Sequence, residues 1–337
     1  MTTFDKSQID VAELGGLELL RVVQALGLGM PETSEKLTNG GCAANYHVTF
    51  TAGDDVVVKA CTGEDAEALA ESQLAVLKHL ALHAKGAAPP LKSLVITPCR
   101  TLDGKPAAAM AMGFVTGEAA NLLLKRGEVG EDTVFRALGA ALARVHAAPP
   151  AEGFYDVREG GYVERYVRCA APLETHWNVH EPTGFAAWAV SKGRLAAARK
   201  AVEDASIPSS LLHGDAYADN VMLDGEDAML VDWEDSAIGA CAFDVATAAV
   251  GGCFDVIDDE TCAVDVFPPV ARPKLDVVAA LLESYAAARG AFSAREAELF
   301  VPLMKANALA CALYRFYQCS TLRGNRWVAA APRRRPG

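Results

Sequence analysis

The chain has 337 residues, of which 51% are hydrophobic and 22% are charged, which is enough for a packed interior divided between two lobes or domains. Its 43 acidic and 31 basic residues give a formal net charge of −12, and this excludes a general attraction to nucleic acid or to anionic lipid. The one basic run, Arg333 to Arg335, lies between prolines and is expected to be a solvated tail.

The nine cysteines are scattered, and no two of them form C-x-x-C. A disulfide framework and a structural zinc site are therefore not expected. The first residues lack the apolar core of a signal peptide, and no apolar stretch approaches the ~20 residues that span a bilayer. We expect a cytoplasmic protein in a reducing compartment, or a plastid protein if a transit peptide has been removed. Membrane and nucleic acid are not expected as partners, and a homodimer is left open.

The first part of the chain is predicted to combine short strands with one long helix. Apolar spacing and turn residues predict a helix at 17–26, strands at 46–50 and 56–60, a helix at 64–83, and strands at 94–97 and 108–115. Residues 40–60 thus form a β-hairpin with a glycine-containing entry loop. This order predicts a small, mostly antiparallel sheet with one long helix.

Beyond residue 116 the chain becomes mainly helical. The predicted helices cover 132–146, 186–205, 274–289, 294–308 and 310–319, with a short hairpin at 211–232. We therefore divide the chain into a first lobe at 1–115, a second lobe at 116–330 and a tail at 331–337.

The segment His213 to Asn220, which reads H-G-D-A-Y-A-D-N, carries the strongest chemical signal. Asp232 follows Asn220 by twelve residues, in D-W-E, and the intervening hairpin would fold it back beside Asn220. Phosphoryl transfer needs one carboxylate that orients the acceptor hydroxyl and takes its proton, and it needs a carbonyl-type ligand and a second carboxylate that hold Mg²⁺. Asp215, Asn220 and Asp232 supply these three groups.

This pattern resembles the protein-kinase catalytic loop H-R-D-x-x-x-x-N followed by D-F-G. With Gly for Arg and D-W-E for D-F-G, it looks more like the aminoglycoside phosphotransferase/choline kinase family, over residues 37–320. The resemblance implies an α+β, bilobal protein kinase-like fold. A small antiparallel β-rich N-lobe with one long helix would bind ATP, and a larger α-helical C-lobe would carry catalysis and substrate binding.

The resemblance also assigns roles to individual residues. It implies that Asp215 is the catalytic base and that Asn220 and Asp232 are ligands of Mg²⁺. His213 and Asp244 are then expected to support the loop structurally.

A kinase also needs a lysine that reaches the α- and β-phosphates, at the end of a strand. Lys59 follows three valines and fits, although a lysine that simply leaves an edge strand would look the same. Its carboxylate partner on the following helix is predicted to be Glu71, with Glu67, one turn earlier, as the alternative.

Two backbone segments complete the predicted nucleotide site. The loop that contains Gly40, Gly41 and Asn45 would cover the phosphates, but it lacks a full G-x-G-x-x-G and is supported only by its position before the hairpin. The stretch from Met112 to Phe114 would act as a hinge whose backbone hydrogen-bonds adenine, or else it is an ordinary strand end.

For the acceptor, D-A-Y-A-D-N resembles D-L-F-P-D-N of the homoserine kinase-like branch, whereas D-W-E is closer to choline and aminoglycoside kinases. We predict a small amino-alcohol or hydroxy amino acid, homoserine-like, with choline, ethanolamine or an aminoglycoside as alternatives. Candidate acceptor-binding residues are Tyr217, Asp219, Glu234 and Trp177, with Arg315 for an acceptor carboxylate.

Two other classes of protein compete with a kinase. A non-catalytic, nucleotide-binding pseudokinase is disfavoured because Lys59, Asp215, Asn220 and Asp232 are all present. An unrelated hydrolase is disfavoured because the chain has no G-x-S-x-G, H-E-x-x-H or P-loop.

Overall fold

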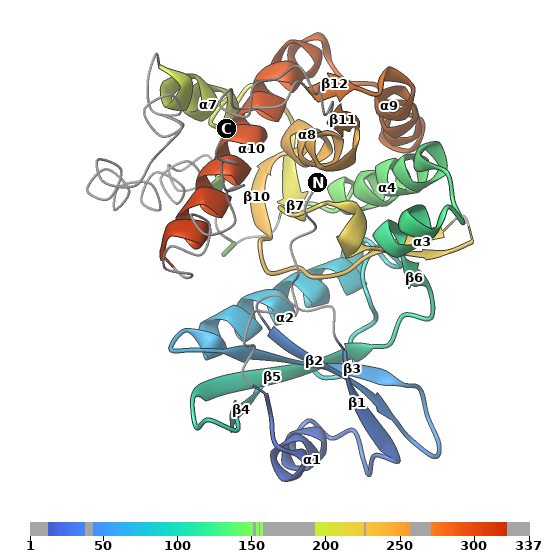
Figure 1. Cartoon of the computed structure of the whole chain (residues 1–337), viewed down its shortest axis with the longest axis vertical. Coiled ribbons are helices and arrows are strands. Elements are labelled where there is room, and N and C mark those ends of the chain that lie inside the picture. Colours follow the sequence, from blue (N-terminus) through green and yellow to red (C-terminus); the bar gives the residue numbers. More distant parts are fainter. Residues whose placement is uncertain are drawn as a thin grey trace, which may run out of the picture.

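The computed structural model describes residues 13–37, 43–150, 153–154, 156–157, 193–225, 227–256 and 271–321, with the backbone alone for residues 195, 255, 256, 271 and 312–321. Figure 1 shows a lobe built on a sheet below a larger, mainly helical lobe. The predicted α+β, bilobal architecture is confirmed.

The first lobe is a five-stranded antiparallel sheet in the order β1-β2-β3-β5-β4. Its strands are β1 (Thr33–Leu37), β2 (Ala43–Thr49), β3 (Val56–Thr62), β4 (Thr97–Arg100) and β5 (Pro106–Gly113). The predicted hairpin appears as β2 and β3, whose register sets Asn45 opposite Lys59. The strand predicted at 94–97 was wrong in its bounds: β4 begins at Thr97, and Leu94 and Val95 are exposed.

A helix covers each face of this sheet. Helix α1 (Gly16–Ala25) lies on the outer face, and α2 (Ala66–His83) lies between the sheet and the second lobe (Figure 1). Side chains alternate along a strand, so Val58 and Ala60 of β3 pack on the α1 side, and Cys61 packs on the α2 side. Lys59, two residues before Cys61, therefore projects from the α2 face, toward the second lobe.

The second lobe packs helices around two short hairpins. Its elements are β6 (Glu118–Ala119), α3 (Ala120–Arg126), α4 (Glu131–His146), α7 (Arg194–Val202), β7 (Ser209–Leu212), η3 (Ala218–Asn220), β8 (Val221–Asp224), β9 (Asp227–Leu230), β10 (Ala237–Ala240), α8 (Cys241–Gly252), β11 (Phe254–Val256), β12 (Ala271–Pro273), α9 (Leu275–Arg289) and α10 (Ala294–Thr321). Gly139 lets α4 approach α9, since a Cβ there would lie 2.5 Å from the Leu281 carbonyl oxygen. The two helices predicted from 294 to 319 are one helix, α10, which also contains Pro302.

The two lobes share one hydrophobic core. Leu74, Leu77 and Met110 of the first lobe belong to the same buried cluster as Leu138 and Leu230 of the second. The Leu230 N–H also donates a 3.0 Å hydrogen bond to the Ala87 carbonyl oxygen. This shared core holds β3 in place against the segment that follows β9. Within the described ranges, no helix combines the length and the apolar character that crossing a membrane requires.

Candidate active site

The loop after β7 is shaped by one glycine. Gly214 has a φ of +84°, in the left-handed region that side chains other than hydrogen disfavour. A Cβ at this position would lie only 2.1 Å from the Asp235 carbonyl oxygen. The loop can therefore turn and pass this close to Asp235 only with glycine between His213 and Asp215.

His213 braces this loop against the segment that leads to Asp232. Its ring is fully buried, and its Nε2 donates a 2.9 Å hydrogen bond to the Val231 carbonyl oxygen, while its Nδ1 accepts one of 3.3 Å from the Asp215 N–H. Burial lowers the pKa of His213, so the ring stays neutral and serves as donor and acceptor at once. The predicted structural role of His213 is confirmed.

Asp244, at the start of α8, fixes the backbone of the same loop through hydrogen bonds. It is fully buried, and its two oxygens accept hydrogen bonds from the N–H groups of His213 (2.7 Å) and Gly214 (3.0 Å). His146 Nε2 lies 3.2 Å from the same carboxylate, and His146 Nδ1 lies 2.8 Å from the Tyr285 hydroxyl. Burial would raise the pKa of Asp244, but the hydrogen bonds that it accepts from the His146 side chain and the His213 N–H outweigh burial and hold that pKa low. Its expected supporting role is confirmed.

Asp215 and Asn220 lie side by side in this loop. The Asn220 Nδ2 donates to the Asp215 main-chain oxygen at 2.9 Å and to its Oδ2 at 2.8 Å. Since the amide nitrogen faces Asp215, the amide oxygen of Asn220 is turned away, as a metal ligand requires. Burial raises the pKa of Asp215 to about 7, with added repulsion from Asp235 and Asp219. A carboxylate with such a pKa is suited to act as a general base near neutral pH.

Asp232 meets Lys59 across the boundary between the lobes. Asp232 is the one non-glycine residue with a positive φ (66°) in the described part of the chain, and such backbone outliers are often functional. Its Oδ1 lies 2.6 Å from Lys59 Nζ, and Glu234 Oε2 lies 3.7 Å from the same nitrogen. Burial would lower the pKa of Lys59, but the two carboxylates outweigh it and raise that pKa. Lys59 is thus a buried, charged ammonium.

The predicted pairing of Lys59 with the long helix was wrong. Glu71 and Glu67 are both exposed on α2, and the carboxylates within 4 Å of Lys59 in the described structure are those of Asp232 and Glu234. The polar residue on the buried face of α2 is Gln73, which donates a 3.5 Å hydrogen bond to Cys61 Sγ. Position 73 falls within the repeat of buried residues along α2, but it carries an amide, so a pattern that requires a carboxylate does not identify it.

The described backbone places part of the predicted nucleotide site. Asn45 lies directly opposite Lys59 on β2, and residues paired in this way share a face of the sheet. Gly40 and Gly41 lie outside the described residues. In the predicted hinge, Met112 lies near the end of β5, but the N–H of Phe114 already donates to the Asp55 carbonyl oxygen at 3.0 Å. The Phe114 ring also stacks on His47, with 3.9 Å between centroids. The Phe114 N–H is therefore not a free donor for adenine.

The predicted acceptor residues do not all lie together. Asp219 is half-buried, and its carboxylate helps to raise the pKa of Asp215, which places it near the base. Glu234 lies beside Lys59, and its predicted role in acceptor binding stays a prediction. Trp177 lies outside the described residues, and of Arg315 only the backbone, in α10, is described.

Tyr217 is engaged with the helices behind the loop. Its hydroxyl lies 3.3 Å from Asn307 Oδ1 and 2.9 Å from Cys311 Sγ, both on α10. Its ring covers Gly251 of α8, where a Cβ would lie 1.9 Å from the ring. These contacts attach the catalytic loop to α8 and α10. No sequence pattern had pointed to Asn307 and Cys311, because they lie 90 or more residues away from Tyr217.

The residues present fit a cation that is coordinated partly by the protein and partly by the phosphates of a nucleotide. In the described part of the chain, no three His, Cys, Asp or Glu residues are grouped so that they could hold a metal by themselves. Mg²⁺ commonly takes only one or two protein carboxylates and completes its shell with phosphates and water. Asn220 and Asp232, with the amide orientation described above, match such a site.

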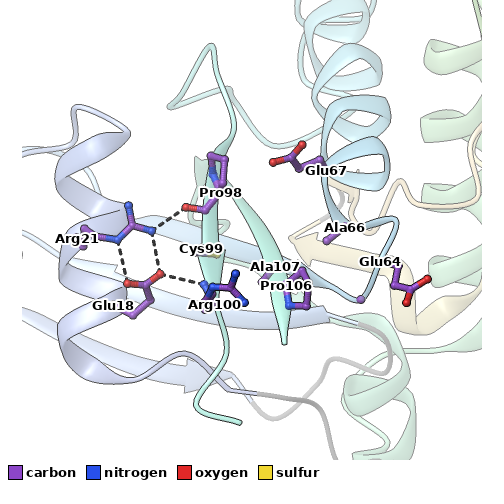
Figure 2. Close-up of a pocket in the computed structure, with 11 residues that line it drawn as sticks. Glu18, Arg21, Glu64, Ala66, Glu67, Pro98, Cys99, Arg100, Pro106 and Ala107 are labelled. Carbon is purple, nitrogen blue, oxygen red and sulfur yellow. Dashed lines mark hydrogen bonds and ion pairs between the residues drawn. The ribbon is translucent and has the colours of Figure 1, made fainter. Parts of the chain in front are cut away.

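A separate pocket of about 410 Å³ lies at the edge of the first lobe (Figure 2). Its walls come from α1, β4, the start of β5, and the first turn of α2 with the loop before it, and Glu67 lines it. The Glu18 carboxylate accepts hydrogen bonds from the Arg21 side chain and from the Arg100 N–H across one wall. The pocket is lined by no residue of the catalytic loop. Glu67 therefore lies on a different surface of the first lobe from Lys59.

The comparisons with known proteins agree with this geometry. A model of the phosphotransferase enzyme family matches residues 35–296, and no curated protein matches the sequence. A choline/ethanolamine kinase family protein from Mesorhizobium loti is 17% identical, with a TM-score of 0.58 over 90% of this chain and 85% of that one. A macrolide 2'-phosphotransferase from Brachybacterium faecium is 16% identical, with a TM-score of 0.57 over 90% of this chain and 96% of that one. A variant aminoglycoside 2'-phosphotransferase in a GDP complex is 14% identical, with a TM-score of 0.59 over 94% of each chain. At these identities the structures show a shared fold.

Proposed function

Because the chain belongs to the phosphotransferase enzyme family, we propose that it is an ATP-dependent kinase that transfers the γ-phosphate of ATP to a hydroxyl group of a small molecule. The observation that carries the proposal is the assembly of Asp215, Asn220, Asp232 and Lys59. A 2.8 Å contact joins Asn220 to Asp215, and a 2.6 Å contact joins Asp232 to Lys59 of the other lobe. The two pairs are held side by side because the N–H of Val231, which precedes Asp232, donates a 3.0 Å hydrogen bond to the Asn220 carbonyl oxygen.

Each of these residues has a defined task in the proposed reaction. Asp215 orients the acceptor hydroxyl and takes its proton as the oxygen attacks the γ-phosphorus. Lys59 binds the phosphates of ATP, which replace Asp232 as its nearest anionic partner. Asn220 and Asp232 would hold Mg²⁺, which supplies positive charge against the phosphate oxygens when bound. The loop's braces, His213 and Asp244, keep the base oriented.

The proposed acceptor is a small amino-alcohol or hydroxy amino acid, with homoserine as the leading candidate. The acid Asp219 near Asp215 supports an acceptor with an ammonium group, because a carboxylate there would attract it. The names of the similar structures favour choline, ethanolamine or an aminoglycoside as a second candidate. A macrolide is a further candidate acceptor, because one of the similar structures is a macrolide 2'-phosphotransferase.

The proposal is tested by a coupled assay with Mg²⁺ that detects the ADP released from ATP and, separately, the GDP released from GTP. The acceptor panel is homoserine, hydroxylysine, choline, ethanolamine, an aminoglycoside and a macrolide. We expect acceptor-dependent ADP release by the wild type, lost in Asp215→Ala. Nucleotide binding without turnover for every acceptor would instead support a pseudokinase, and ADP release that persists unchanged in Asp215→Ala would refute the role of this loop.

A further inference from the structure

Both carboxylates that lie within 4 Å of Lys59 in the described part of the chain, those of Asp232 and Glu234, belong to the second lobe. The Lys59 side chain is 4% exposed, its nearest partner is Asp232 at 2.6 Å, and Glu234 lies at 3.7 Å. A buried ammonium needs a compensating anion, because desolvation penalises its charged form. Asp232 is also the proposed ligand of Mg²⁺, so its charge is shared once nucleotide and metal are bound. Among the described residues, Glu234 is then the carboxylate that stays available to balance the charge of Lys59.

Helix α2 offers Lys59 no such carboxylate. The buried positions of α2 carry alanine, leucine and valine, apart from Gln73. Gln73 reaches Cys61, which follows Lys59 by two residues on the same face of β3, roughly 7 Å along the strand. An amide at this place is neutral and can balance no charge. The acids of α2 that are nearest in sequence, Glu71 and Glu67, are exposed.

We propose that Glu234 is a positioning residue that holds Lys59 for the phosphates of ATP, in place of a carboxylate on α2. This inference rests on the proposed kinase function. It means that the position of Lys59 is tied to the D-W-E segment of the second lobe rather than to α2. Removal of the Glu234 charge should therefore impair nucleotide use, and a carboxylate introduced on the inward face of α2 should compensate for it.

The kinetic test uses Glu234→Gln, Gln73→Glu and the double variant, with Glu67→Gln as the matched control on α2. We expect Glu234→Gln to raise the KM for ATP about tenfold, with a smaller fall in kcat and an unchanged KM for the acceptor. Addition of Gln73→Glu should bring the KM for ATP back to within about threefold of the wild type. An unchanged KM for ATP, a change confined to the KM for the acceptor, or a lack of rescue would each overturn the proposal.

A second measurement does not depend on catalysis. In nucleotide-free protein with EDTA, Glu234→Gln should lower the Tm, and Gln73→Glu should restore it. In a Lys59→Met background neither substitution should have this effect, since the charge to be balanced is gone. Tm shifts of equal size in the wild-type and Lys59→Met backgrounds would overturn the pairing. Rescue of the Tm without any kinase activity in the wild type would confirm the ion pair and refute the proposed function.

Discussion

The two ends of the candidate site are built in different ways. At the base of the catalytic loop, Asp244, His213 and His146 are buried and joined by short hydrogen bonds within one lobe. At the other end, Lys59 depends on ion pairs with residues more than 170 positions away, in the other lobe. The first arrangement is a buried, hydrogen-bonded and therefore rigid support of the loop that carries Asp215. The second can exchange a carboxylate for a phosphate, as nucleotide binding requires.

The largest effect on stability is expected from Asp244→Ala. The substitution leaves the N–H groups of His213 and Gly214 and the ring of His146 without their acceptor inside the protein. We expect a loss of about 3–5 kcal/mol in the free energy of unfolding, measured by urea denaturation. A loss below about 1 kcal/mol would show that this end of the site is not the rigid support described above.

Gly214→Ala should follow in size. The added Cβ meets the Asp235 carbonyl oxygen at 2.1 Å in a backbone with positive φ, so we expect a loss of about 2–4 kcal/mol together with loss of activity. Gly225→Ala is the matched control, because Gly225 also has a positive φ (63°) but open space around its Cβ. The control should lose only about 1 kcal/mol. Equal losses would mean that backbone conformation, and not the contact with Asp235, determines the choice of glycine.

Asp215→Asn should stabilise the protein while it lowers the rate of phosphoryl transfer by about 10²–10⁴-fold. Burial and neighbouring acids raise the pKa of Asp215 to about 7 in the folded state, against about 3.9 in the unfolded state. Between these values the folded state keeps a proton that the unfolded state has lost, so this group's contribution to stability falls as pH rises from about 4 to about 7. Without nucleotide or metal, the variant should gain about 1–3 kcal/mol at pH 8, and the gain should vanish near pH 4. A gain that is independent of pH would argue against the raised pKa.

The smallest effect is expected from Glu71→Gln. Glu71 is exposed and takes no part in the ion pairs of Lys59, so the free energy of unfolding should change by less than about 0.5 kcal/mol. The KM for ATP should stay within about twofold of the wild type. If the KM rises tenfold or more, α2 supplies the carboxylate to Lys59 after all, at least in the nucleotide-bound state.

The same contrast separates what could be predicted from the sequence from what could not. The catalytic loop was predictable because His213, Asp215 and Asn220 lie within eight residues and a short hairpin carries the chain on to Asp232. Lys59 was predictable as the polar residue in an apolar strand. Its partner was not, since a contact between residues 59 and 234 leaves no local pattern. Strand β1 was missed because it is largely exposed and does not alternate.

The proposed active site is tested most directly by transfer of labelled γ-phosphate from ATP to a small hydroxyl acceptor, with the wild type and Asp215→Asn compared at pH 8, where both are expected to be folded. We predict a labelled acceptor with the wild type and a rate lower by about 10²–10⁴-fold with the variant. Equal transfer by the two proteins would contradict the assignment of Asp215 as the base and, with it, the proposed active site.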